Sequence, residues 1–200
     1  MAESIGVFGG TFDPPHIGHL ILAAEALSQL QLDRVLWVVT PEPPHKPNLP
    51  ITNVYQRIEM TRRVIANNPV FELSTIESDR PGPHYTLDTI DLLQIRNPTS
   101  RLVLLIGGDS LRDLPTWNRP EELVTAVHSF GVMRRPGAVF DLSALEDSLP
   151  GLKNKLRFFE TPQLEISSSS IRERIANKGH YRYYLPADVY DFIQKNRIYR

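Results

Sequence analysis

SIGVFGGTFDPPHIGHL, residues 4–20, decides the fold of this chain. The apolar run at 4–8 predicts a buried strand, and the glycines and prolines after it predict a tight turn. Residues 16–31 predict a helix that is apolar almost all round and hence largely buried. A strand that leads through such a turn into a helix presents backbone N–H groups and the positive end of the helix dipole to an anion.

Strand and helix signals alternate over the rest of the chain. We expect strands at 34–40, 70–74, 101–106 and 126–133, a short one at 158–159, and helices at 53–67, 86–95, 168–178 and 186–196. Continuous apolar strands in this order predict an α/β fold, a Rossmann-like doubly wound parallel sheet that binds ligands at the carboxyl ends of its strands. We expect one domain over residues 1–200, of which about 165–200 form a small C-terminal helical portion.

Composition excludes several classes of protein. The 200 residues are 41% hydrophobic and carry a formal net charge of -1, which gives no global attraction to nucleic acid or anionic lipid. The absence of cysteine excludes disulfides, thiolate catalysis and Cys-ligated zinc. The N-terminal residues lack the basic region of a secretory signal, and no apolar run is long enough to span a bilayer, so we expect a cytoplasmic protein.

His16 and His19, in the sequence His-Ile-Gly-His, fall in the first turn of the predicted helix. At this spacing both rings lie on one helix face and can meet one ligand. Taken alone, they are open to two interpretations: buried histidines that hold the turn, or donors to phosphate oxygens. A metal site is disfavoured because no third ligand clusters with them and HExxH is absent.

A second hydroxyl-rich helix start occurs late in the chain, in EISSSSIRER at residues 165–174. Its serines either cap a helix with a solvated Arg-Glu face, or bind an anion together with Arg172 one turn later. Lys46, in the proline-rich loop 41–50, is either an exposed lysine or a charge carried over a phosphate chain. Asp109 is either a helix N-cap or an acceptor for ribose hydroxyls, and Trp117 either a core or rim aromatic or a stacking platform.

Motifs along nearly the whole length decide between these interpretations. They are residues 9–19 (GGTFDPPHIGH), 43–46 (PPHK), 84–86 (HYT), 106–110 (IGGDS), 115–117 (PTW), 134–137 (RRPG), 166–172 (ISSSSIR) and 197–200 (RIYR). Together they resemble the nucleotidyltransferases of the class I synthetase type, and within them the bacterial nicotinate-nucleotide adenylyltransferases. The first and last motifs are shared with other adenylyltransferases, whereas IGGDS…PTW and HYT point to this branch. Ser169 stands where the family often has Thr, which keeps the hydroxyl.

The resemblance implies an enzyme of NAD biosynthesis. In the implied reaction, the 5′-phosphate of nicotinate mononucleotide attacks the α-phosphorus of ATP in line, deamido-NAD forms and pyrophosphate leaves. The nucleophile is already anionic, so neither a general base nor a covalent enzyme intermediate is required. Mg²⁺ would arrive with ATP rather than occupy a metal site of the protein. The implied partners are the two substrates, without nucleic acid or membrane, and a homo-oligomer is possible.

The resemblance also implies roles for individual residues. Those expected to act at the reacting phosphates are His16, His19, Lys46 and Arg172. Those expected to bind ATP are Gly9, Gly10, Thr11, His16, His19, Gly107, Asp109, Arg134, Ile166, Ser168, Ser169, Ser170 and Arg172. Those expected to bind nicotinate mononucleotide are Gly10, Thr11, Phe12, Lys46, Tyr85, Thr86, Asp109, Trp117 and Asn118, with main-chain N–H groups near Thr86 and Asn118 at the pyridine carboxylate.

Other functions remain to be distinguished. An adenylyltransferase for nicotinamide mononucleotide or another phosphomonoester, such as 4′-phosphopantetheine, would share most of the motifs. A nucleotide-binding module without catalysis would keep the sheet but would not require both histidines together with Arg172. A fragment of a class I tRNA synthetase is disfavoured, because no anticodon-binding domain fits the length and no KMSKS-like lysine pair is present.

Overall fold

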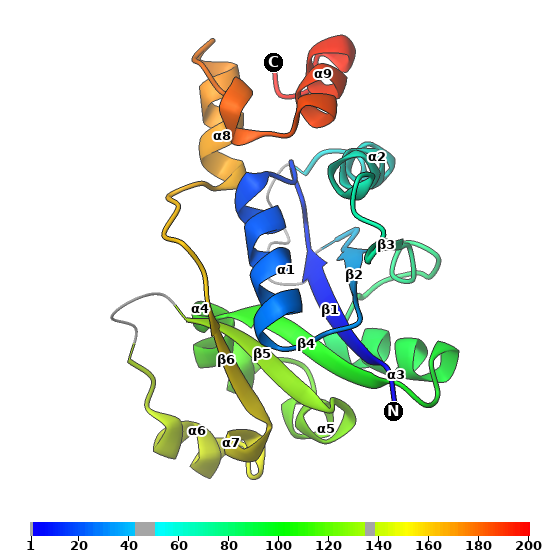
Figure 1. The fold of residues 1–200 in the computed structure, drawn as a ribbon, viewed down its shortest axis with the longest axis vertical. Coiled ribbons are helices and arrows are strands. Elements are labelled where there is room, and N and C mark those ends of the chain that lie inside the picture. The colour runs from blue at the N-terminus through cyan, green and yellow to red at the C-terminus, as the bar shows by residue number, and fades with distance from the viewer. Residues whose placement is uncertain (1, 43–50, 135–138) are drawn as a thin grey trace.

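The computed structural model describes residues 2–42, 51–134 and 139–200, and these contain a six-stranded sheet in the order β3-β2-β1-β4-β5-β6 (Figure 1). All neighbouring strands are parallel. The strands are β1 (Ser4–Gly10), β2 (Arg34–Val39), β3 (Phe71–Ser74), β4 (Arg101–Gly107), β5 (Ser129–Arg134) and β6 (Leu156–Glu160). The expected Rossmann-like parallel sheet is therefore confirmed.

Helices connect these strands and cover both faces of the sheet. They are α1 (Ile17–Gln29), α2 (Val54–Ile65), α3 (Thr86–Arg96), α4 (Gly108–Asp113), α5 (Pro120–Ala126), α6 (Leu142–Ser148), α7 (Leu152–Lys155), α8 (Ser168–Ala176) and α9 (Ala187–Asn196), with short 3₁₀ turns at Leu114–Thr116 and Arg182–Tyr184. No helix in the described part of the chain is long and apolar enough to cross a membrane.

Two apolar clusters lie on the two faces of the sheet, because successive strand residues point to opposite sides. On one face, Phe8 and Trp37 pack with residues of α1, α2, α8 and α9. On the other face, Val7 and Leu104 pack with residues of α3, α4 and α5. The C-terminal residues from Ile171 to Ile198 contribute to the first cluster, and Figure 1 shows α8 and α9 beyond the carboxyl end of β1.

The strand order changes direction between β1 and β4, which is where open parallel sheets form a crevice at their carboxyl ends. The turn from β1 to α1 begins on one side of this crevice, and α4 begins directly at the end of β4 on the other side. The fold therefore places the first and the IGGDS motifs at one edge of the sheet.

The expected strand at 126–133 is wrong at its start. Residues Pro120–Ala126 form α5, and β5 begins only at Ser129. Pro120 at the first helical position, followed by Glu121 and Glu122, is a helix-start signal. The apolar residues that follow it were assigned to the strand instead. Helices α6 and α7 were also not expected, although Asp141 caps α6 by accepting from the N–H groups of Ser143 and Ala144.

The first helix is less buried than its apolar sequence predicts. Of its residues only Ala23 and Ala26 are fully buried, and most of the others are half-buried. One side of α1 packs on the sheet, while α8 and the chain before it reach the helix only near its N-terminal end (Figure 1). An apolar face that is partly covered by a distant segment has the same local sequence pattern as a fully buried one.

Candidate active site

His16 is the N-cap residue of α1 rather than a residue of its first turn. Its main-chain N–H donates to Nδ1 of His19 at 3.1 Å, and the two imidazole rings stack with centroids 3.7 Å apart. Because Nδ1 of His19 accepts this bond, the proton of a neutral His19 is on Nε2. The expected pairing of the two rings at one place is therefore present, as a stack held by the helix cap.

Both histidines are neutral at physiological pH. Burial lowers the pKa of His16 to about 4. Burial also lowers the pKa of His19 well below its ordinary range, and the neighbouring His16 adds to this effect. A neutral imidazole keeps one N–H group, which can donate a hydrogen bond to a phosphate oxygen, so this pair can stabilise negative charge at neutral pH.

Gly18, between the histidines, makes room for the His16 ring. A Cβ atom at this position would lie 3.1 Å from both Cε1 and Nδ1 of that ring. Such a contact is tighter than side chains normally tolerate, so the ring would have to shift. The glycine of the His-Ile-Gly-His sequence thus fixes the position of the first histidine.

Helix α8 meets the turn before α1 from the other end of the chain. Nη1 of Arg172 donates to the main-chain oxygen of Asp13 at 2.7 Å, and the Ser168 hydroxyl donates to that of Pro14 at 2.8 Å. The two sequence motifs expected to bind triphosphate are therefore in direct contact. Since these donors are used within the protein, the hydroxyl of Ser168 is less available to a ligand than we expected.

The other serines of this motif cap the helix. Ser167 is the N-cap and accepts from the N–H of Ser170 at 3.1 Å, while the Ser170 hydroxyl donates to the Ser167 oxygen at 2.9 Å. Ser169 is exposed and its hydroxyl lies 3.0 Å from that of Ser167. The capping interpretation of the serine run is therefore correct for Ser167 and Ser170, and anion binding by Ser168, Ser169 and Ser170 together with Arg172 stays a prediction.

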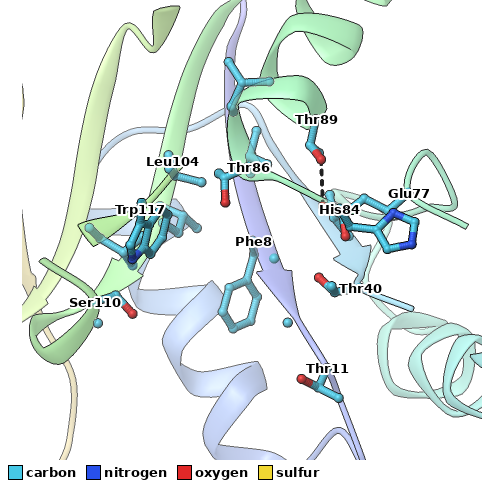
Figure 2. A pocket seen from close by; sticks show the side chains of 18 residues that line it. Phe8, Thr11, Thr40, Glu77, His84, Thr86, Thr89, Leu104, Ser110 and Trp117 are labelled. Carbon is cyan, nitrogen blue, oxygen red and sulfur yellow. Dashed lines mark hydrogen bonds between the residues drawn. The ribbon is translucent and has the colours of Figure 1, made fainter. Parts of the chain in front are cut away.

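A pocket of about 240 Å³ opens at the crevice between β1 and β4. Of the residues predicted to bind substrates, Gly9, Gly10, Thr11, Thr86, Gly107 and Trp117 line it. Figure 2 shows Trp117 and Ser110 on one side, His84 and Glu77 on the other, and Thr86 between them. The half-buried indole of Trp117 faces a space of the size that an aromatic ring requires.

Buried polar groups form the wall of the pocket opposite Trp117. Oε1 of Glu77 accepts from the hydroxyl of Thr89 at 2.7 Å, and burial raises the pKa of the Glu77 carboxyl. The side chain of Thr40 also hydrogen-bonds to the Glu77 carboxyl, and among the described residues Nδ1 of His84 is buried without a hydrogen-bond partner. Polar groups of this kind give an apolar pocket its preference for one orientation of a ligand.

Several predicted residues in the described part of the chain lie outside this pocket. The ring of Phe12 is buried in the core against His19 and Trp37, so only its main chain could contact a substrate. The carboxylate of Asp109 is exposed and pairs with Arg112 at 3.2 Å, and the N-cap of α4 is Gly107, which removes the N-cap interpretation of Asp109. Tyr85 is itself the N-cap residue of α3. Lys46 lies outside the described residues.

The remaining predicted residues have the following places. Asn118 is exposed and accepts from Nε of Arg119 at 3.2 Å. Arg134 ends β5 with its guanidinium 5.0 Å from the centroid of the Phe158 ring. Ile166 precedes α8 and its Cβ would lie 4.0 Å from a Cβ on Gly18. Ile166 thus adjoins the histidine turn, whereas the guanidinium of Arg134 packs on Phe158 of the neighbouring strand β6.

Comparison with known proteins assigns the family. A profile of the cytidylyltransferase-like family matches residues 7–174. The chain is 40% identical over 197 residues to nicotinate-nucleotide adenylyltransferase from Bacillus subtilis, which covers 98% of this chain and 98% of that protein. This chain belongs to the nicotinate-nucleotide adenylyltransferase family. The solved structure of the Plasmodium falciparum nicotinic acid mononucleotide adenylyltransferase complexed with NaAD has the same fold, with a TM-score of 0.78, 21% identity and coverage of 98% of this chain and 97% of that one.

In this nicotinate-nucleotide adenylyltransferase, sequence reasoning missed three side chains that hold the histidine turn. Arg57 is fully buried and donates to the main-chain oxygens of Thr52, Thr11, Thr40 and Pro41 at 2.7–2.8 Å. Asp13 is buried, and its carboxylate accepts from the hydroxyl of Tyr199 at 2.6 Å. Asp13 and Tyr199 each carried a signal, because they fall in the 9–19 and 197–200 motifs, but neither side chain was assigned a role.

Proposed function

We propose that this enzyme transfers the adenylyl group of ATP to the 5′-phosphate of nicotinate mononucleotide. A phosphate oxygen of the mononucleotide forms a bond to the α-phosphorus of ATP, and the bond from that phosphorus to the bridging oxygen of the leaving pyrophosphate breaks. The products are deamido-NAD and pyrophosphate. The observation that carries the proposal is the contact between Arg172 and Asp13, which brings the late cation to the histidine turn beside the Trp117 pocket.

The histidines and Arg172 act on the phosphates in this proposal. The Nε2–H of neutral His19 donates to oxygens at the α-phosphorus, where negative charge develops in the transition state. The ring of His16 stacks on that of His19 and holds the His19 ring in its orientation. Arg172 retains further guanidinium N–H groups beside the one that holds Asp13, and these are directed to the triphosphate. The attacking phosphate is already ionised, so no residue has to act as a base.

The pocket between Trp117 and the Glu77 wall takes the pyridine ring. Trp117 stacks on the ring, and the N-terminal N–H groups of α3, which begins at Thr86, meet its carboxylate. The aligned dipole of this eleven-residue helix favours an anion at that end. An uncharged amide gains less there, which supports a preference for the acid form of the mononucleotide.

Mg²⁺ enters in this proposal as a complex with ATP. The described residues contain no group of three or more His, Cys, Asp or Glu side chains that could hold a metal ion. In the proposal, phosphate oxygens supply most of the ligands of the cation. When bound, it neutralises charge on the triphosphate. We further infer a cytoplasmic enzyme, and a homo-oligomer stays a prediction.

Steady-state turnover with a panel of phosphomonoesters tests this function. The purified chain is given ATP, Mg²⁺ and, in separate reactions, nicotinate mononucleotide, nicotinamide mononucleotide or 4′-phosphopantetheine, and pyrophosphate release is measured. We expect deamido-NAD and pyrophosphate in equal amounts from the first, and much slower turnover of the others. Equal turnover of acid and amide would refute the specificity, and no turnover with any of them would favour a binding module.

A further inference from the structure

Tyr199, the penultimate residue of the chain, reaches the turn before α1. The residue is half-buried, and its hydroxyl donates to Oδ1 of Asp13 at 2.6 Å, although 186 residues separate the two in sequence. The same carboxylate accepts from the main-chain N–H of Thr52 through Oδ2 at 3.2 Å. Asp13 is only 3% exposed, so both oxygens of this carboxylate depend on protein donors rather than on bulk water.

The main chain around Asp13 holds the residues proposed to act on the phosphates. The Asp13 main-chain oxygen accepts from Arg172, and the next oxygen along, of Pro14, accepts from Ser168. His16 follows three residues after Asp13 and begins α1. A change in the position of Asp13 therefore moves Arg172 and the histidine pair together.

We propose that Tyr199 is a positioning residue of the active site, which acts through Asp13 to align Arg172 and the histidine turn on the triphosphate of ATP. This inference rests on the proposed function. Without the hydroxyl, Oδ1 of the buried carboxylate loses its donor, and the carboxylate reorients toward another partner. The turn then shifts by a fraction of an ångström, which is enough to impair in-line transfer while the core keeps its packing.

The conservative variant Tyr199→Phe tests this role, because it removes only the hydroxyl. We expect kcat/KM for ATP to fall by about 10- to 100-fold. The KM for nicotinate mononucleotide should stay within about twofold of the wild-type value, since neither Asp13 nor Tyr199 lines the Trp117 pocket. A role in stability alone would lower the Tm and leave both kinetic constants of the folded enzyme unchanged.

Tyr181→Phe is the matched control. Tyr181 lies in the same C-terminal part and the same apolar cluster, and its hydroxyl is hydrogen-bonded to the side chain of Gln194 instead of to the turn. We expect this variant to retain wild-type kcat/KM for ATP even where its Tm falls. An equal loss of kcat/KM in both variants would overturn the proposal, and so would wild-type kcat/KM in Tyr199→Phe.

A double-mutant cycle with Asp13→Asn tests the path through Asp13. The neutral amide is a weaker acceptor than the carboxylate, so Tyr199→Phe should cost less in the Asp13→Asn background than in the wild type. An equal cost in both backgrounds would overturn the path. The wild-type enzyme is assayed alongside, to separate the proposed function from the positioning role of Tyr199. If the wild-type enzyme does not turn over, the proposed function and this inference are both refuted. If the wild-type enzyme turns over normally and Tyr199→Phe is unaffected, only this inference is refuted.

Discussion

The main-chain N–H of His16 lies 3.1 Å from Nδ1 of His19, so the first residue of the His-Ile-Gly-His sequence sets the tautomer of the last. The second ring is left with its proton on Nε2, and the pKa of each imidazole is lowered by burial. A cap that serves the helix thus also prepares a neutral hydrogen-bond donor. The structural interpretation of these histidines is therefore correct, and the same cap geometry supports the proposal that they donate to phosphate oxygens.

The low pKa of His16 predicts how stability changes with pH. In the folded protein this pKa is about 4, below the ordinary value of about 6.5, so the unfolded chain binds more protons between these values. The contribution is fully present above pH 6.5 and is lost as the pH falls toward 4. We expect the free energy of unfolding to fall by about 2 kcal/mol from pH 7 to pH 5 through this residue. Urea unfolding at the two pH values measures it.

His16→Asn removes this titration and serves as the comparison. Its free energy of unfolding should fall less between pH 7 and pH 5 than that of the wild type, whatever its absolute stability. Identical pH slopes for the two proteins would show that His16 is not the group responsible.

Gly9 and Gly10 should respond differently to substitution by alanine. A Cβ on Gly10 would lie 2.8 Å from the buried ring of Phe12, whereas a Cβ on Gly9 would meet nothing within 4 Å and would project into the open crevice. We therefore expect Gly10→Ala to lose about 1–3 kcal/mol of stability. Gly9→Ala should keep its Tm but show a higher KM for its substrates. Thermal unfolding and steady-state kinetics of both variants test this, and a normal KM in Gly9→Ala would contradict it.

Arg57 should matter more to stability than any exposed arginine of α2. Arg57→Met leaves four partly buried main-chain oxygens without a charged donor, so we expect a loss of about 3 kcal/mol or more. The control is Arg62→Met on the same helix, where the side chain is 60% exposed and pairs with Glu59. That change should cost less than about 1 kcal/mol. Chemical denaturation of both variants measures the difference, and equal losses would refute the role of Arg57.

Trp117→Ala tests the pyridine pocket. Loss of the stacking surface should raise the KM for nicotinate mononucleotide by about tenfold or more, with little effect on the KM for ATP. Trp117→Phe keeps an aromatic face and should restore most of the affinity. Tyr183→Ala, at a side chain that is 89% exposed, is the control for loss of a large aromatic residue. An unchanged KM for nicotinate mononucleotide in Trp117→Ala would show that the indole does not contact this substrate.

Local signals in the sequence were sufficient for the sheet and for the two helix starts. The strand, turn and helix of residues 4–20 and the serine-capped start of α8 each depend on neighbours within a few residues, so their patterns could be interpreted directly. Helix α5 was missed because its seven residues form less than two full periods of the apolar pattern. Short helices depend on their caps, and Pro120 was the signal to use.

The contacts that join distant segments could not be predicted in the same way. Tyr199 and Asp13 are 186 residues apart, and neither residue type nor spacing indicates that a hydroxyl and a carboxylate meet there. Arg57 resembles any other arginine of an amphipathic helix until its four main-chain acceptors are known. The pocket is similar. The sequence singled out Trp117, Thr86 and the motif that contains His84, but Glu77 carried no signal and enters the pocket only through the packing of the segment between β3 and α3.

A double-mutant cycle between His19 and Arg172 tests most directly whether the two ends of the chain form one site for the triphosphate. With ATP and nicotinate mononucleotide as substrates, we expect His19→Ala and Arg172→Ala each to lower kcat by about 100-fold or more in folded protein. The double variant should lose much less than the product of the two factors, because both donors stabilise the same transition state. Wild-type kcat in either folded single variant, or losses that multiply in full, would contradict this account.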